Sequence, residues 1–166
     1  MSRRAWSAFD GLNQKPLREP IHLTIDKSGR WWKGEDFDDL AEYIRTLTAE
    51  GYPAERIVQS ICACGGTVFR LEADAEEGCA RRTCVGCEAT AFICDSGEYW
   101  ADAEPEPVAC PCGGEQFELG VGFSPRANGD VRWITVGERC TRCGILGSAT
   151  DWKIDYGPTD RLFDQV

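Results

Sequence analysis

The chain opens with a stretch that lacks any periodic pattern and continues with strand-like alternation. Residues 21–25 alternate apolar and polar side chains, which is typical of a strand. Asp26–Gly29 has the composition of a turn, and Arg30–Trp32 begins a second alternating run. The pattern therefore predicts a β-hairpin that starts at residue 21.

Helical spacing follows directly after this predicted hairpin. Four apolar residues recur on one helical face, namely Phe37, Leu40, Ile44 and Leu47. Acidic residues in the first turn suit the helix dipole and Gly51 is a natural stop, so we predict a helix over residues 36–50. The apolar residues between Pro53 and Ile61 fit a helix or a strand, and we assign a strand over residues 56–62.

Beyond residue 58, short strand patterns alternate with cysteines, and the chain divides into segments. We expect an extended or flexible arm over 1–20, a hairpin and helix module over 21–58, a cysteine-bearing module over 59–97, an acidic proline-containing linker over 98–107, a second cysteine-bearing module over 108–157 and a C-terminal tail over 158–166.

Cysteine is the unusual feature of the composition, since the 166 residues include ten cysteines and one histidine. Eight of the cysteines form four close pairs, namely Cys62 and Cys64, Cys84 and Cys87, Cys110 and Cys112, and Cys140 and Cys143. Such pairs direct two thiolates at one metal ion, and the chain begins without a secretory signal pattern. The spacing favours structural zinc over disulfides or an iron–sulfur or redox role.

The pairs also repeat together with their surroundings. Residues 62–72 align with residues 110–120 at an offset of 48, and the two CxxC pairs align at an offset of 56. The repeat predicts one site from Cys62, Cys64, Cys84 and Cys87 and another from Cys110, Cys112, Cys140 and Cys143. In the alternative assignment, Cys84 and Cys87 join Cys110 and Cys112, and the outer pairs meet.

Each copy reads CxC, strand, turn, strand, CxxC, strand, which resembles a zinc ribbon over roughly residues 60–95 and 108–156. The resemblance implies two knuckles on β-hairpins that hold one tetrahedral Zn²⁺ by four thiolates. The CxC half is a departure, because CxxC in both halves is commoner in that family. We therefore expect a small α+β protein, with an N-terminal β-hairpin and helix followed by two zinc-ribbon modules and two structural Zn²⁺ ions.

Two cysteines lie outside the pairs. Cys79 and Cys94 flank the Cys84–Cys87 pair at similar distances, so antiparallel strands would make them near neighbours. They are a possible redox pair or reserve ligands, while the simpler interpretation is two small buried apolar residues.

The chain is acidic, with a formal net charge of −10, and residues 61–107 alone hold ten acidic and three basic residues. This balance disfavours non-specific nucleic-acid binding and binding to anionic membranes. Four arginines beside the CxxC pairs form a possible local basic patch, namely Arg81, Arg82, Arg139 and Arg142.

The sequence contains no established catalytic motif, and a four-cysteine zinc site has no open coordination position. The only histidine, His22, has no visible partner for acid–base chemistry. We therefore expect a cytoplasmic, non-catalytic zinc protein that serves as a scaffold for a macromolecular partner, and we expect this partner to be a protein. The alternatives are a nucleic-acid or transcription-associated ribbon, a thiol or zinc redox sensor, and an acidic inhibitor or immunity-type protein.

Overall fold

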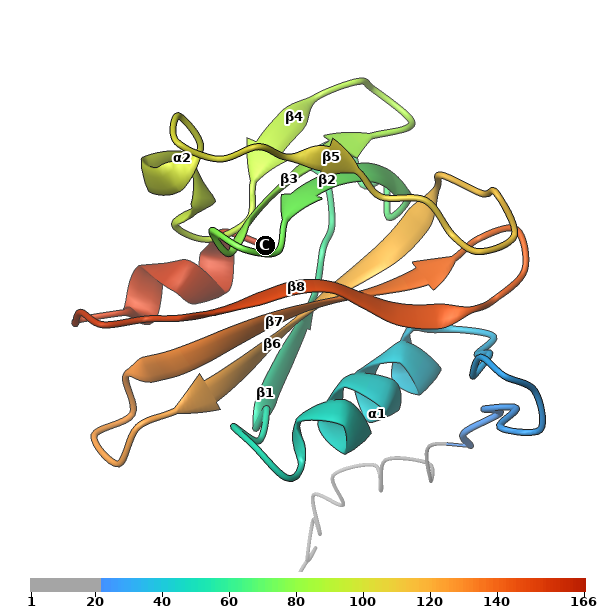
Figure 1. Ribbon diagram of the computed structural model, residues 1–166, viewed down its shortest axis with the longest axis horizontal. Helices are drawn as coiled ribbons and strands as arrows, with labels where there is room; N and C mark the ends of the chain where they lie inside the picture. Colours follow the sequence, from blue (N-terminus) through green and yellow to red (C-terminus); the bar gives the residue numbers. More distant parts are fainter. Residues whose placement is uncertain (1–21) are drawn as a thin grey trace, which may run out of the picture.

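The computed structural model describes residues 22–166, and the predicted arm over 1–20 lies outside these residues. All the strands of the described chain belong to one antiparallel sheet, in the order β4-β3-β2-β6-β7-β8, with β1 paired to β6 and β5 paired to β2 (Figure 1). The helices are minor elements, so the fold is α+β in a loose sense. The strands are β1 (Arg56–Gln59), β2 (Phe69–Asp74), β3 (Cys79–Cys84), β4 (Thr90–Phe92), β5 (Glu106–Pro107), β6 (Phe117–Pro125), β7 (Val131–Cys140) and β8 (Leu146–Lys153).

The two copies of the repeat meet at equivalent residues. Phe69 of β2 pairs with Phe117 of β6, and these residues are related by the offset of 48. Within each copy the register also matches, since Phe69 lies opposite Cys84 and Phe117 lies opposite Cys140. Both phenylalanines are buried in the main core, which draws on strands of both copies. The cysteine-bearing halves therefore share one sheet and one core.

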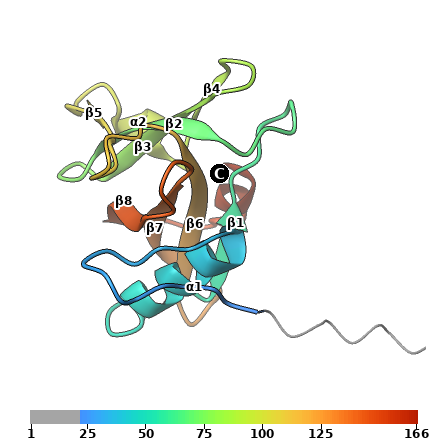
Figure 2. The same ribbon diagram turned by 90° about the vertical axis from the view of Figure 1, so that its right-hand side faces the viewer.

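The predicted helix is confirmed as α1 (Phe37–Thr48). Asp36 caps it, because its side chain accepts a hydrogen bond from the Asp39 N–H at 3.1 Å. Leu40 and Ile44 are fully buried against the sheet and form the centre of a second, smaller core cluster. In Figure 2, α1 lies on one side of β6–β8 and β2–β4 lie on the other.

Glycines in the sheet allow α1 to pack closely. A Cβ atom on Gly137 or on Gly122 would lie 2.7 Å from a side-chain carbon of Ile44. We expect Gly137→Ala to lower the free energy of unfolding by about 1–3 kcal/mol, because the added methyl overpacks this contact. Urea unfolding measures the change, and Gly51→Ala is the control, since a Cβ there meets nothing within 4 Å. Equal stability of the two variants would contradict the prediction.

The predicted N-terminal hairpin is present only in part. Residues 22–25 form no strand, and Asp26 and Lys33 make only an isolated bridge. Lys33 makes a second isolated bridge to Ile145. The chain is instead attached to α1, because the buried Asp39 carboxylate accepts from the Thr24 N–H at 2.8 Å and from the Thr24 hydroxyl at 2.6 Å. A lone two-stranded hairpin is marginal in water, and these side-chain bonds replace it.

The strand assigned to residues 56–62 is present in part, as β1. The predicted extended linker over 98–107 differs in detail, because the short helix α2 (Ser96–Tyr99) runs into it and β5 joins the sheet. The predicted tail contains the 3₁₀ helix η1 (Asp160–Asp164), whose Leu162 is fully buried in the main core. Over residues 22–166 no helix has the length and hydrophobicity needed to cross a membrane.

Candidate metal centres

The eight paired cysteines form two groups, one from each copy of the repeat. In the first tetrad, the sulfur atoms of Cys62, Cys64, Cys84 and Cys87 all lie within 4.8 Å of one another. The shortest separations are 3.5 Å between Cys62 and Cys87 and 3.6 Å between Cys64 and Cys84. Cys84 ends β3, and the other three lie in the turns beside the strands.

The second tetrad repeats this geometry. It consists of Cys110, Cys112, Cys140 and Cys143, whose sulfur atoms also lie within 4.8 Å of one another. Cys110 and Cys143 are 3.5 Å apart, and Cys112 and Cys140 are 3.7 Å apart. The alternative assignment, with Cys84 and Cys87 beside Cys110 and Cys112, is not the arrangement found.

The sulfur positions fit a tetrahedral metal ion. Metal–sulfur bonds of about 2.3 Å in a tetrahedron separate the sulfurs by about 3.8 Å. The shortest separations in both tetrads are close to this value, and all ten cysteines are free thiols. Each tetrad can therefore hold one metal ion with thiolate ligands alone. That this ion is zinc stays a prediction.

Each CxC pair lies in a tight turn closed by two backbone hydrogen bonds. The Cys62 N–H donates to the Gly66 carbonyl at 2.8 Å, and the Gly65 N–H donates to the Cys62 carbonyl at 2.8 Å. Cys110, Gly113 and Gly114 repeat the pattern at 2.7 and 2.8 Å. The first glycine of each pair has a positive φ, +87° at Gly65 and +82° at Gly113, which favours glycine.

The second glycine of each pair leaves room for the sulfurs. A Cβ on Gly114 would lie 2.9 Å from the Cys140 sulfur, and a Cβ on Gly66 would lie 2.9 Å from the Cys84 sulfur. We expect Gly114→Ala to weaken zinc binding at the second tetrad at least tenfold, because the methyl displaces a ligand. Competition with a chromophoric chelator measures this. Gly129→Ala is the control, since Gly129 has a φ of +90° but nothing within 4 Å; equal affinities would contradict the prediction.

Backbone N–H groups acidify one thiol in each tetrad. The pKa of Cys62 is lowered to about 7. The backbone N–H of Cys64 contributes most to this pKa shift, and a hydrogen bond with the Cys87 thiol contributes next. The N–H of Gly114 lowers the pKa of Cys112 to about 7. A lower pKa favours the thiolate, which is the form that binds metal.

The residue two positions before each CxxC pair differs in charge between the copies. It is Arg82 in the first copy and Glu138 in the second, at the repeat offset of 56. The guanidinium of Arg82 lies 4.6 Å from the Phe69 ring centroid and donates to the Val166 carbonyl at 2.7 Å, while its Nε has no hydrogen-bond partner. Burial lowers the pKa of Arg82, and the nearby Cys62 and Cys84 thiols act in the opposite direction.

Glu138 is a half-buried acid that was not predicted from the sequence. Its Oε2 is shielded from solvent and has no hydrogen-bond partner, and burial raises the pKa of Glu138 to about 8. Glu138 aligns with Arg82 in the repeat, so a comparison of the two copies was the signal that could have identified this acid.

Three of the four arginines of the possible basic patch are engaged within the protein. Arg81 donates to Glu72 at 2.7 Å and Arg139 donates to Glu118 at 2.7 Å. Arg82 is only 9% exposed, and Arg142 is exposed beside the Cys112 carbonyl. Because consecutive strand residues point to opposite faces, Arg81 and Arg82 do not share one face. Three of the four charges are thus paired or buried.

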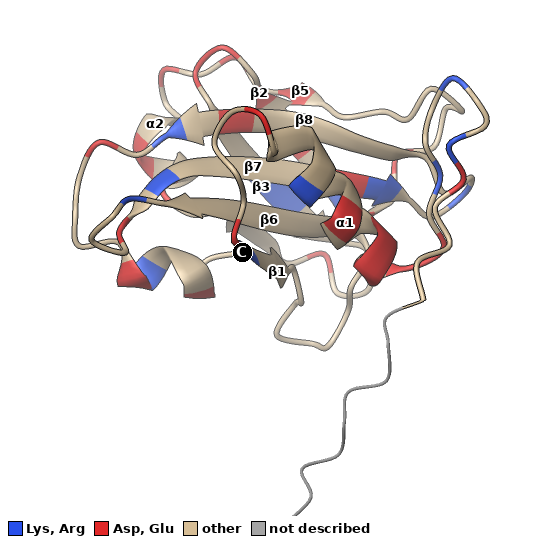
Figure 3. Ribbon diagram, turned by 90° about the horizontal axis from the view of Figure 1, so that it is seen from below, with Lys and Arg blue, Asp and Glu red and all other residues tan. Residues whose placement is uncertain are grey.

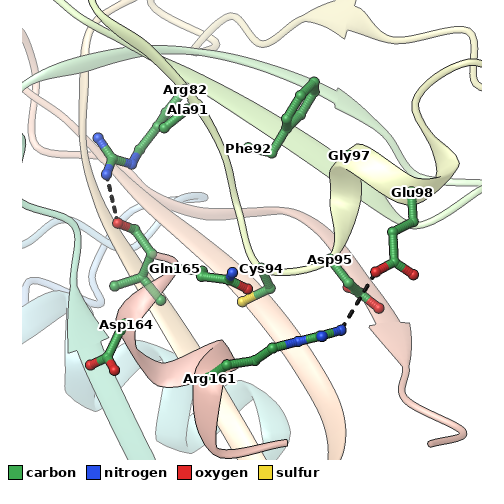
Figure 4. Close-up of a pocket in the computed structure, with 11 residues that line it drawn as sticks. Arg82, Ala91, Phe92, Cys94, Asp95, Gly97, Glu98, Arg161, Asp164 and Gln165 are labelled. Carbon is green, nitrogen blue, oxygen red and sulfur yellow. Dashed lines mark hydrogen bonds and ion pairs between the residues drawn. The ribbon is translucent and has the colours of Figure 1, made fainter.

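The two remaining cysteines lie in the core and belong to neither tetrad. Cys79 is fully buried and Cys94 is 7% exposed, and burial raises the pKa of both thiols. Cys94 lines a cavity together with Arg82, Arg161 and Glu98 (Figure 4), and its sulfur lies 3.6 Å from the Leu162 carbonyl oxygen. Burial disfavours the reactive thiolate, so both environments match the simpler interpretation of these cysteines.

A buried hydrogen-bonded group connects the residue before α2 to β8 and to the segment that follows β8. The buried Asp95 carboxylate accepts from the Trp152 indole N–H at 2.9 Å and from the Tyr156 hydroxyl at 3.0 Å. Both donors are neutral groups that bind a carboxylate. Because Asp95 directly precedes α2, these hydrogen bonds hold the start of α2 against the core. His22 is exposed.

A comparison with known proteins finds no matching family model, no similar curated protein and no similar solved structure.

Proposed function

We propose that each tetrad binds one structural Zn²⁺ in a ribbon-like module, and that the folded protein is a non-catalytic scaffold for a basic protein partner. The observation that carries the zinc assignment is the convergence of four sulfurs within 4.8 Å in each copy. Four thiolates complete a tetrahedral zinc site and leave no position for water or substrate.

The distribution of charge supports a basic partner. Six acidic residues from the end of β2 through the β2–β3 turn and from the segment through β5 line a cavity of about 650 Å³, namely Asp74, Glu76, Glu77, Asp102, Glu104 and Glu106. Figure 3 shows acidic residues along the edge that carries β2 and β5. The tetrads add to this charge, since four thiolates and one Zn²⁺ carry a net charge of −2. An acidic surface steers a basic partner toward it.

Native mass spectrometry of freshly purified protein, paired with denaturing mass and thiol counting, tests the zinc assignment. We expect two Zn²⁺ ions per chain and ten reduced cysteines. A single zinc ion, another metal, or the loss of hydrogens to disulfides would overturn it.

A further inference from the structure

A second cavity, of about 380 Å³, lies beside the second tetrad. Trp31 and Tyr43 line it from the side of α1, and Pro111 and Phe117 line it from the side of the CxC turn. Cys110 of the second tetrad also lines it. The cavity thus combines aromatic rings with the edge of a predicted metal centre, and no lining residue in the described chain is basic.

Glu138 supplies the one carboxylate among the described residues that line this cavity. Its Oε2 is buried without a hydrogen-bond partner. Gly147 makes room for the carboxylate, because a Cβ at that position would lie 2.4 Å from the Glu138 Oε1. A buried acceptor without a donor is unfavourable, so a donor that enters the cavity would relieve this cost.

The surroundings select a cationic donor. Aromatic faces attract ammonium and guanidinium groups, and the Arg30 guanidinium already lies 5.1 Å from the Trp31 ring centroid. The basic residue next to Glu138 in the chain, Arg139, is held by Glu118 at 2.7 Å. A zinc-loaded tetrad adds negative charge at Cys110, which disfavours an anionic ligand.

We propose that this cavity binds the side-chain cation of a lysine or arginine residue on the partner protein, with Glu138 as its counter-ion and Trp31 and Tyr43 as its aromatic walls. The inference rests on the proposed scaffold function and specifies where the basic partner is anchored. A charged side chain in a pocket lined by aromatic residues is a common centre of binding energy at protein interfaces.

The zinc-loaded full chain is titrated with the peptide acetyl-Ala-Lys-Ala-amide at pH 8.5, where the lysine side chain is still protonated. NMR signals of the carbon-bound Tyr43 ring protons report binding. The same peptide with norleucine in place of lysine has a similar apolar stem without the ammonium. We expect saturable shifts with the lysine peptide and at least tenfold weaker binding of the norleucine peptide.

Variants distinguish binding of the peptide in this cavity from a general effect of the protein's net charge. We expect Glu138→Gln to weaken lysine-peptide binding at least tenfold, while Glu50→Gln, which removes the same charge from an exposed position, leaves it within twofold. Trp31→Leu is a second variant at a side chain that is already 45% exposed, and we expect weaker binding there too. Equal binding of the two peptides, or equal loss in Glu138→Gln and Glu50→Gln, would overturn the inference.

The metal content distinguishes failure of this inference from failure of the proposed function. Each variant is checked by native mass spectrometry for two zinc ions. A protein that holds two zinc ions but does not bind the lysine peptide overturns the cavity assignment alone, whereas a wild-type protein without zinc overturns the proposed function.

Discussion

Cys84→Ser is expected to lower the zinc content from two ions to one and to destabilise the whole described fold. Structural zinc contributes on the order of 10 kcal/mol of apparent folding free energy in small domains, which is comparable to the total stability of an ordinary domain. Cys84 is fully buried, and it lies opposite Phe69, the residue that joins the two copies of the repeat. Loss of the metal at this position therefore destabilises the pairing of Phe69 with Phe117 as well as the first tetrad.

The unfolding behaviour should be cooperative. The main core contains Cys84 and Cys140 together with strand residues of both copies, so the two halves do not have separate cores. We expect a single thermal transition that moves to a lower temperature by 10 °C or more, consistent with several kcal/mol in a chain of this size. Two separate transitions, with the second one at the wild-type temperature, would show that the copies fold independently.

Cys79→Ala is the matched control for Cys84→Ser. Cys79 begins the same strand, is also fully buried and belongs to neither tetrad. We expect this variant to keep two zinc ions and to lose only the smaller stability that truncation of a buried thiol costs. Thermal unfolding followed by circular dichroism and native mass spectrometry gives both quantities. Retention of two zinc ions by Cys84→Ser would contradict the assignment of Cys84 as a ligand.

The tetrads and α1 could be predicted from the sequence because their signals are local. A CxC pair, its two glycines and a CxxC pair lie within about 35 residues in each copy, and the repeat shows which pairs belong together. The apolar stripe of α1 likewise lies within four turns, and its N-cap Asp36 is adjacent.

The features that the sequence did not predict depend on contacts between distant residues. Alternation at residues 21–25 is compatible with a strand, but the Asp39 carboxylate, 15 residues from Thr24, supplies the hydrogen bonds instead. The alternation of apolar and polar residues does not show that Phe69 pairs with Phe117, since several strands of this chain have a similar alternation. Asp95 precedes an acidic, proline-containing segment that is typical of a solvated linker. The Asp95 side chain is nevertheless buried, and it accepts hydrogen bonds from two aromatic side chains.

The charge difference between the two copies has a consequence for how each tetrad holds its metal. A zinc ion with four thiolates carries a net charge of −2, and a nearby buried cation offsets part of it. The first tetrad has Arg82 at the equivalent position where the second copy has Glu138, and the thiols of Cys62 and Cys84 favour the charged guanidinium. The Nε of Arg82 is buried and has no hydrogen-bond partner.

Arg82→Met is therefore expected to weaken zinc binding at the first tetrad by 10- to 100-fold, the usual effect of removing a residue that supports metal ligands, and to leave the second tetrad unchanged. Chelator competition gives the two affinities, and alkylation of the released thiols followed by mass mapping shows which cysteines lose the metal first. Arg81→Met is the control, because it removes the same charge from the neighbouring residue, which pairs with Glu72. Arg82→Lys keeps the charge and should recover part of the affinity. Equal zinc affinities in Arg82→Met and Arg81→Met would show that Arg82 serves only the packing against Phe69.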